Sequence, residues 1–293
     1  MPELPDVEVY REALAARLIG QTLRAVLLRN PFVLRTAVPP LDAVVGKTVR
    51  DVLRIGKRVV LAFDDEYFLV LHLMIAGRLQ WLTDGRKPPG KITLVFFEFP
   101  TGTLAFTEAG TKRRASLHLV HGAAALAAFD AGGLDVLSVS EEIFRERLLR
   151  ENHTLKRALT DPRLFSGIGN AYSDEILHRA RLSPLTLTKK LDAGKIARLF
   201  VATRDVLTEW TDRLRCEAAG EFPQRVTAFR PQMAVHGRFG QPCPVCGAPV
   251  QRIVYAENES NYCARCQTDG VILADRALSR LLHKSFPRSL DDG

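Results

Sequence analysis

The sequence lacks the features that would place it in a membrane or outside the cell. It has no run of eighteen apolar residues, which excludes an ordinary transmembrane helix. Its N-terminus, MPELPDVEVYREAL, is acidic from the third residue and is unlike a signal peptide. It has only five cysteines, and in a cytoplasmic chain cysteines seldom form disulfides. We therefore expect a cytoplasmic protein that does not associate with membranes.

The composition also lacks the marks of disorder. Hydrophobic residues make up 46% of the chain and charged residues 25%, which are ordinary globular values. The chain has 41 basic against 33 acidic residues and a pI near 9.4. That balance favours a polyanionic partner such as nucleic acid, although a basic surface without such a partner has the same composition.

Four of the five cysteines have the spacing of a structural zinc site. Cys243, Cys246, Cys263 and Cys266 form the pattern C-x2-C-x16-C-x2-C. Two such turns supply four thiolates to a tetrahedral ion and leave no position open for water. The segment between them alternates in part and predicts a β-hairpin, so we expect a zinc β-ribbon. The alternative is four reduced cysteines without metal. Cys216 is predicted to be a small packed residue.

The first half of the chain is predicted to be rich in β-strands. An amphipathic helix is expected over residues 8–18, and Pro5 and Asp6 suit a helix start. Short runs of Val, Leu and Phe separated by turn residues then indicate a sandwich or barrel. These runs are residues 23–30, 48–55, 58–63, 68–74, 77–82, 92–99 and 102–107.

The second half has helical periodicity. Helices are expected within residues 140–150, 155–165, 170–182 and 193–214, and a short one within 272–284. The Ala- and Gly-rich stretch 122–135 reads as a linker. The predicted fold class is α+β with several domains. The expected domains are a β-rich domain over 1–125, a linker over 126–139, a helical domain over 140–234, the zinc ribbon over 235–270 and a tail over 271–293.

The N-terminus offers a nucleophile. Methionine is normally removed before proline, which would expose the secondary amine of Pro2. An α-amino group has a pKa of about 7.7–8.0, so part of it is neutral at pH 7. Such an amine can attack an aldehydic sugar carbon and give an iminium, while Glu3 moves protons. An inert, trimmed terminus is the alternative.

Two further stretches suggest contacts with an anionic ligand. Lys57 directly precedes an apolar strand, where its ammonium can reach a phosphate or a sugar oxygen; a plain strand-end lysine is the alternative. Gly167 and Gly169 form a tight turn, and Asn170 opens the next helix. The N-terminus of a helix attracts anions, although glycine also serves ordinary helix–helix connections.

These stretches together resemble one family. MPELPDVE, IGKRVVLAF, HLMIAGRL, LTDPRLFSGIGNAYSDEILHRARLSP and YCARCQ occur in that order over nearly the whole chain. They resemble the formamidopyrimidine-DNA glycosylase / endonuclease VIII family. The resemblance implies a β-sandwich with a leading helix, a helix–two-turn–helix domain and a zinc ribbon with one structural Zn²⁺. It also implies a bacterial, nucleoid-associated monomer that acts on damaged double-stranded DNA.

The resemblance also implies roles for individual residues. Pro2 would attack C1′ of a damaged nucleotide, Glu3 would transfer protons, and Lys57 would contact the lesion's phosphate and sugar. Asn170 and Lys156 would bind DNA beside the flipped nucleotide. The implied activity is that of a bifunctional base-excision-repair enzyme, a DNA glycosylase and AP lyase that cleaves by β,δ-elimination.

The chain departs from the family pattern at the ribbon. Asn258 stands where the family has an arginine that contacts the lesion phosphates, and Glu257 and Glu259 flank it. A neutral amide loses the charge-assisted contact. Arg252, or an arginine elsewhere in the chain, is a candidate to compensate for it.

A second departure concerns the residues that fill the space left by a flipped base. Ile75 stands at the place of an intercalating methionine, with Met74 one residue earlier. The usual DPRRFG segment appears as EAGTKRRAS, which keeps basic residues at Lys112, Arg113 and Arg114 and lacks the phenylalanine.

Because these departures touch base recognition, three hypotheses remain. Oxidised purines of the formamidopyrimidine and 8-oxoguanine type are the expected substrates. Oxidised pyrimidines, the endonuclease VIII type of substrate, are the second possibility. The third is a protein that binds DNA damage and abasic sites with weakened catalysis.

Overall fold

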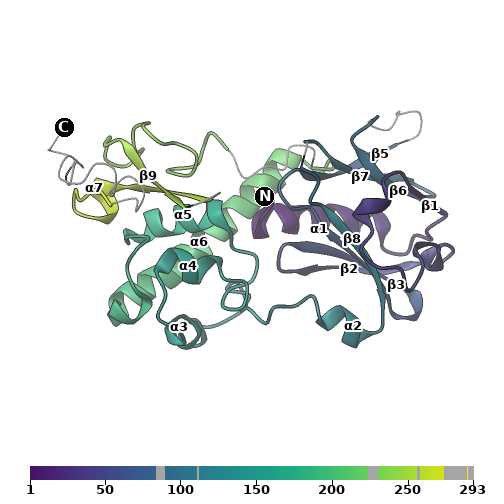
Figure 1. The fold of residues 1–293 in the computed structure, drawn as a ribbon, viewed down its shortest axis with the longest axis horizontal. Helices are drawn as coiled ribbons and strands as arrows, with labels where there is room; N and C mark the ends of the chain where they lie inside the picture. Colours follow the sequence, from purple (N-terminus) through teal and green to yellow (C-terminus); the bar gives the residue numbers. More distant parts are fainter. Residues whose placement is uncertain (84–89, 111, 224–229, 256–257, 274–288, 290–293) are drawn as a thin grey trace. The chain divides into compact units, whose positions relative to one another are not determined.

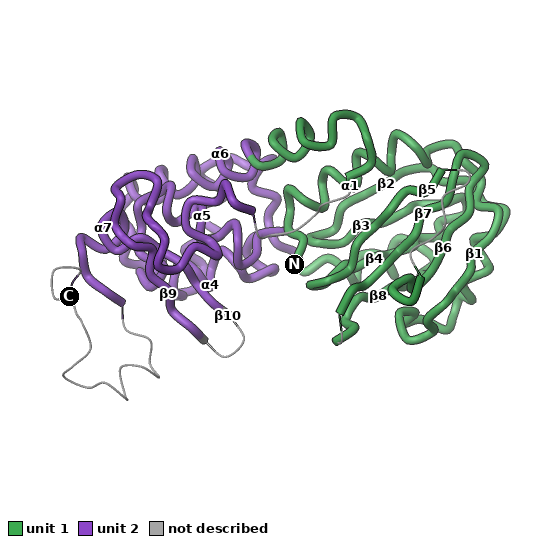
Figure 2. Tube along the Cα trace, turned by 90° about the horizontal axis from the view of Figure 1, so that it is seen from above, with its two compact units in different colours: residues 1–131, 210–228 green, residues 132–209, 229–293 purple. Residues whose placement is uncertain are grey.

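The structure, a computed structural model, describes residues 1–83, 90–110, 112–223, 230–255, 258–273 and 289. The chain forms two compact units, and neither is continuous in sequence (Figure 2). Unit 1 combines Met1–Ala131 with Trp210–Ala228, and unit 2 combines Gly132–Glu209 with Phe229–Gly293. The domain boundaries expected from sequence stay a prediction. Within the described residues, no helix is long and apolar enough to cross a membrane.

Unit 1 begins with helix α1 (Leu4–Leu18), which starts four residues earlier than its hydrophobic pattern indicated. The reason is a capping box: the backbone N–H of Glu3 donates to Asp6 Oδ2 at 3.0 Å. Pro5 lies in the first turn, where its missing N–H costs nothing. The helix buries one face at intervals of three and four residues, through Val7, Tyr10, Leu14 and Leu18.

Two four-stranded antiparallel sheets form the rest of this unit and confirm the predicted sandwich (Figure 1). One sheet has the order β1-β6-β7-β5 and the other β2-β3-β4-β8. The strands are β1 (Ala25–Leu28), β2 (Val49–Ile55), β3 (Arg58–Phe63), β4 (Tyr67–His72), β5 (Gly77–Leu82), β6 (Thr93–Phe99), β7 (Gly102–Glu108) and β8 (Ser116–His121). Strand β8 was not predicted as a separate run. Val, Leu and Phe side chains of both sheets share one core with α1.

A later segment completes unit 1. The end of α6 (Ala193–Ala218) and the residues after it cluster with the sandwich. Phe222 packs against Tyr10 with ring centroids 5.7 Å apart. Arg215 forms an ion pair with Glu12 at 2.6 Å. The short helix α2 (Ala123–Ala127) lies across the start of the predicted linker.

Unit 2 contains the predicted helices and the ribbon. The helices before α6 are α3 (Glu141–Leu149), α4 (Leu155–Thr160) and α5 (Asn170–Ala180). The side chains of Ser140 and Thr154 cap α3 and α4. Strands β9 (Val250–Tyr255) and β10 (Asn258–Cys263) pair antiparallel as the predicted hairpin, and α7 (Ala264–Gln267) follows. The helix predicted within 272–284 lies almost entirely outside the described residues.

Candidate active site and metal centre

The N-terminal residues are buried at the start of α1. Pro2 is buried, and Glu3 is only 2% exposed. Burial lowers the pKa of the Met1 ammonium below its ordinary value, and the negative charges of Glu3 and Asp6 partly oppose that shift. A lowered pKa makes an amine at this position a better nucleophile at neutral pH.

Lys57 lies in the tight turn between β2 and β3. Ile55 and Arg58 are paired across this turn, and Gly56 adopts a positive φ of 59°. Strand β2, which leads into this turn, contacts α1, because Arg54 Nε pairs with Glu8 Oε2 at 3.2 Å. The charge of Lys57 contributes to the lowered pKa of the Met1 ammonium. Pro2, Glu3 and Lys57 therefore share one region of unit 1.

His72 is a neighbour of this region that the sequence reasoning missed. It is paired with Arg58 across β3 and β4. Burial lowers the pKa of His72 to about 4, and the charges of Arg58 and Lys57 act in the same direction. The neutral imidazole can donate one hydrogen bond and accept another. The only sequence signal was its place in HLMIAG, one residue before Leu73.

Ile75 stands at the tip of a rigid turn. It is 58% exposed, and Met74 before it has a positive φ of 52°. Gly77 donates its N–H to Leu73 O at 2.8 Å. A Cβ at Gly77 would lie 2.2 Å from that oxygen, so only glycine closes the turn. An exposed apolar side chain on a fixed turn suits insertion between bases.

The basic segment Lys112–Arg114 follows β7 and is exposed. The buried side chain of Glu108, which is 2% exposed, holds the backbone of this segment in place. The carboxylate oxygen Oε1 of Glu108 accepts the backbone N–H groups of Arg114 at 2.8 Å and Ala115 at 3.0 Å. Sequence reasoning did not identify this anchor, because a carboxylate beside arginines suggests an ion pair rather than a backbone contact.

In unit 2, two of the residues predicted to bind DNA, Lys156 and Asn170, contact each other. Lys156 Nζ donates to the carbonyl of Asn170 at 2.7 Å and pairs with the buried carboxylate of Asp174. The side-chain amide of Asn170 donates to the carbonyl of Glu259 at 2.6 Å, which ties the start of α5 to the ribbon.

Asp174 also binds two residues from later in the chain. Its Oδ2 lies 2.8 Å from His236 Nδ1, and its Oδ1 accepts from Ser260 Oγ at 2.9 Å. The neighbouring Glu175 accepts three consecutive backbone N–H groups, those of Ala234, Val235 and His236, at 2.7 to 3.0 Å. Two adjacent carboxylates of α5 thus hold the ribbon segment.

Arg252 lies on the face of the ribbon opposite to Ser260. It is paired with Asn261, whereas Ser260 is paired with Ile253. Its guanidinium lies 4.2 Å from the centre of the Phe239 ring and 3.6 Å from Glu259 Oε2. Alternate residues of a strand share a face, so strand position 258 lies on the same face as Ser260. Arg252 and strand position 258 therefore lie on opposite faces of the ribbon. Glu257 lies outside the described residues.

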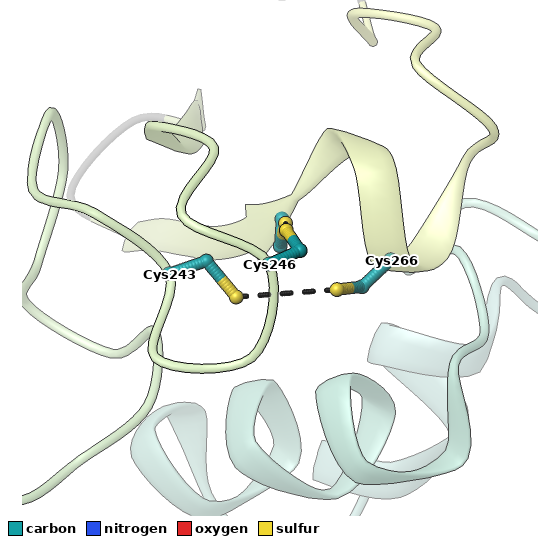
Figure 3. A group of neighbouring side chains, drawn as sticks. Cys243, Cys246 and Cys266 are labelled. Atoms are coloured by element: carbon teal, nitrogen blue, oxygen red, sulfur yellow. Dashed lines mark hydrogen bonds between the residues drawn. The ribbon is translucent and has the colours of Figure 1, made fainter.

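The four predicted cysteines meet at the base of the ribbon. Figure 3 shows three of them, Cys243, Cys246 and Cys266. Their sulfur atoms all lie within 4.8 Å of one another. Cys243 and Cys266 are 3.9 Å apart, and Cys246 and Cys263 are 3.4 Å apart. Tetrahedral zinc with sulfur ligands at about 2.3 Å separates them by roughly 3.8 Å. The cluster fits one structural Zn²⁺.

The zinc cluster has polar support around it. His178 Nε2 of α5 lies 3.3 Å from Cys243 Sγ, which suits a hydrogen bond to a ligating thiolate. The backbone N–H of Cys263 donates to Gln267 Oε1 at 2.8 Å. Cys216 is exposed, so the prediction that it is packed was wrong: it lies near the end of α6, on a turn that faces solvent.

Comparison with known proteins decides the family. Residues 1–114 match the formamidopyrimidine-DNA glycosylase N-terminal domain, and residues 135–213 match the H2TH domain of the same enzyme. Residues 240–268 match the zinc finger found in FPG and IleRS. This chain belongs to the formamidopyrimidine-DNA glycosylase family.

Relatives of this glycosylase family match over nearly their full length. The chain is 34% identical over 288 residues to the formamidopyrimidine-DNA glycosylase of Thermus thermophilus, covering 92% of this chain and 100% of that one. It is 34% identical over 280 residues to that of Heliobacterium modesticaldum, covering 91% and 100%.

Solved structures of Fpg agree with the fold. A Lactococcus lactis Fpg complex with FAPY-dG DNA has a TM-score of 0.80 and 26% identity, covering 91% of this chain and 100% of that one. A complex of the same enzyme with abasic-site DNA has a TM-score of 0.79 and 27% identity, covering 91% and 99%. The predicted family, fold class and structural zinc are confirmed; the roles of individual site residues stay predictions.

Proposed function

We propose that this protein is a base-excision-repair DNA glycosylase with AP lyase activity that removes oxidised purines of the formamidopyrimidine and 8-oxoguanine type. The buried N-terminus beside Lys57 supports this most directly. Burial lowers the pKa of the Met1 ammonium, and the same buried surroundings would favour a neutral, nucleophilic amine on Pro2 once Met1 is removed. The family relationship supports the substrate class, since a related enzyme has been crystallised with FAPY-dG DNA.

Removal of Met1 would make Pro2 the nucleophile. The Pro2 nitrogen attacks C1′, and the bonding electrons of the glycosidic bond leave with the base, which takes up a proton. The Pro2 nitrogen loses its N–H proton, and the C1′–O4′ bond breaks with its electrons passing to O4′, which takes up a proton. This opens the sugar and gives an iminium between Pro2 and C1′. Loss of a C2′ proton then expels the 3′ phosphate, and a second elimination expels the 5′ phosphate. Glu3, buried beside Pro2, carries these protons.

The remaining candidates bind DNA. Lys57 and His72 supply a cation and a neutral imidazole for a lesion phosphate, and Ile75 fills the space left by the flipped nucleotide. Lys112, Arg113 and Arg114 face the opposite strand. In unit 2, Lys156 and the start of α5 at Asn170 bind backbone phosphates, and the ribbon with Asn258 supports them. We infer a monomer that works in the bacterial cytoplasm on nucleoid DNA.

Asn258 favours a second candidate function. A protein without the finger arginine holds lesion phosphates less firmly, so it could bind abasic DNA while cleaving it slowly. Oxidised pyrimidines are the other candidate substrate, because the residues around Ile75 and Lys112–Arg114 depart from the oxidised-purine pattern.

Borohydride trapping on a duplex with one abasic site tests the chemistry. We expect a covalent adduct that maps to Pro2. Pro2→Gly and Glu3→Gln should lose base excision and retain binding of the same duplex. If intact mass shows that Met1 is absent and zinc is bound, a lack of trapping would reject the lyase and favour the damage-binding function. A panel of duplexes with 8-oxoguanine, FAPY-dG and oxidised pyrimidines then assigns the substrate.

A further inference from the structure

Unit 1 has a basic cavity that none of the candidate catalytic residues lines. Among the described residues of its lining, Arg113 is the one that is also among the proposed DNA-binding residues. It has a volume of about 690 Å³ and lies where the segment after β1 meets the start of β6. Its lining includes Arg29, Asn30, Phe32, Lys91, Phe96 and Arg113. That volume is within the range of small-ligand sites, roughly 300–1,000 Å³.

The charged residues among the described lining of this cavity are all basic. Arg29, Lys91 and Arg113 line it, and none of them pairs with a carboxylate among the residues that the structure describes. Arg113 Nη2 donates to the carbonyl of Lys91 at 3.3 Å, which brings two of the cations to one wall. The Arg29 guanidinium lies 6.0 Å from the centre of the Phe96 ring. A surface of this kind attracts an anion.

Phe32 gives the same cavity an aromatic wall that is exposed to solvent. It is 80% exposed, more than any other phenylalanine within the described residues. Its position is fixed, because its backbone N–H donates to Asn30 Oδ1 at 3.0 Å at the start of the short 3₁₀ helix Pro31–Val33. The backbone N–H groups of Arg29 and Asn30 both donate to Leu94 O of β6, which anchors this corner to the sheet.

A flat aromatic surface beside several cations matches one ligand chemistry. A nucleobase stacks on an exposed aromatic ring while its phosphate meets the basic side chains, and this combination binds single-stranded nucleic acid without sequence preference. In a duplex each base is paired with its partner and stacked on its neighbours, so it cannot stack on Phe32. We propose that this cavity binds an unpaired nucleotide of single-stranded DNA, outside the lesion site, so that the protein can hold a duplex and a neighbouring unpaired strand together.

The test uses the full chain already loaded with duplex. Protein saturated with a duplex that contains a tetrahydrofuran abasic analogue is titrated with a fluorescent ten-nucleotide oligothymidylate, and anisotropy reports a ternary complex. Stacking of one base contributes about 1–3 kcal/mol. Phe32→Ala should therefore weaken oligothymidylate binding at least about fivefold, and Phe32→Trp, which keeps a stacking surface, should retain it. Arg29→Gln should weaken binding and make it less sensitive to salt.

Controls separate this site from the proposed repair chemistry. Val45→Ala changes another exposed apolar residue of unit 1, outside the cavity, and should have no effect. Cleavage of the abasic duplex, measured in parallel, should be the same for wild type and Phe32→Ala. The proposal is overturned if loaded protein does not bind the oligonucleotide, or if Phe32→Ala binds it as tightly as wild type. Failure of abasic cleavage in every protein would instead count against the repair function alone.

Discussion

Ser260 on the zinc ribbon donates a 2.9 Å hydrogen bond to the carboxylate of Asp174 on α5, joining residues 86 positions apart in the chain. The same carboxylate pairs with Lys156 and His236. Asp174 itself is 1% exposed. One buried anion thus fixes a candidate phosphate-binding lysine and the ribbon strand in a common arrangement.

Replacing Asp174 should disturb both the position of Lys156 and the attachment of the ribbon strand. Asp174→Asn keeps the volume and leaves Lys156 without its counterion. Breaking a buried pair costs about 3–5 kcal/mol, and the remaining hydrogen bonds should limit the loss to about 2–4 kcal/mol. Denaturant unfolding measures the stability, and anisotropy with an abasic-analogue duplex should show weaker binding. Asp192→Asn, which breaks the exposed pair with Lys195, should cost less than about 1 kcal/mol. Equal losses in the two variants would contradict the assigned role of Asp174.

Asp6 should be a positioning residue for the N-terminal nucleophile. Its side chain accepts the N–H of Glu3, so Asp6→Ala removes a helix cap worth about 1 kcal/mol. The looser N-terminus should lower the single-turnover rate of abasic-site cleavage several-fold and leave the affinity for the duplex unchanged. Asp6→Glu, which restores a carboxylate, should recover most of the rate. A loss of affinity equal to the loss of rate would show a general folding defect instead.

Loss of zinc should unfold the ribbon and weaken DNA binding. Cys246→Ser leaves three thiolates, which is too few for a closed tetrahedral site. Zinc content by atomic absorption should fall, and the affinity for abasic duplex should fall with it, by at least about tenfold. Cys216→Ser, at the cysteine outside the cluster, should keep both zinc and affinity. If the zinc-free protein bound DNA as tightly as wild type, the ribbon would have no part in binding.

Acid should destabilise unit 1 through His72. The pKa of His72 is about 4 when folded, against 6.5 for the ordinary side chain. Between these values the unfolded chain binds the proton more readily, so stability is complete above pH 6.5 and falls as the pH drops towards 4. His72→Gln removes this effect. Its thermal midpoint should therefore fall less than that of wild type between pH 7 and pH 4.5 in scanning calorimetry.

His178 has a similarly low pKa, of about 4, and adds to the acid sensitivity of every variant, so the comparison is between slopes rather than absolute midpoints. His121→Gln changes an exposed histidine and serves as the control. Parallel curves for His72→Gln and wild type would remove His72 as the source of the effect.

The sequence revealed the parts that local patterns encode. The spacing of Cys243 and Cys246 with the later pair predicted the metal cluster. This was possible because all four ligands lie close together in the sequence, so their assembly depends little on contacts with distant segments. The two-residue alternation predicted most strands. In contrast, the roles of Glu108 and Glu175 were invisible. Both carboxylates accept hydrogen bonds from backbone N–H groups. Every residue type except proline has a backbone N–H, so the sequence does not show which residues will be the partners.

Other misses have a similar physical origin. The early start of α1 depends on the Glu3–Asp6 capping contact, which outweighs the weaker apolar pattern of the first turn. The face of the ribbon on which Arg252 lies, opposite to position 258, could not be inferred from the sequence either. The pairing of Arg252 with Asn261 sets its face of the ribbon, and strand register was not available before the structure.

The discontinuous make-up of unit 1 has a consequence for its synthesis. Tyr10 emerges from the ribosome near the beginning of translation, yet its ring partner Phe222 follows more than two hundred residues later. The sandwich cannot finish its packing around α1 until then, although N-terminal domains usually fold first during synthesis. A fragment that stops at Ala131 would therefore expose the apolar surface around Tyr10 and should depend on chaperones, whereas a nicked but full-length chain should stay assembled.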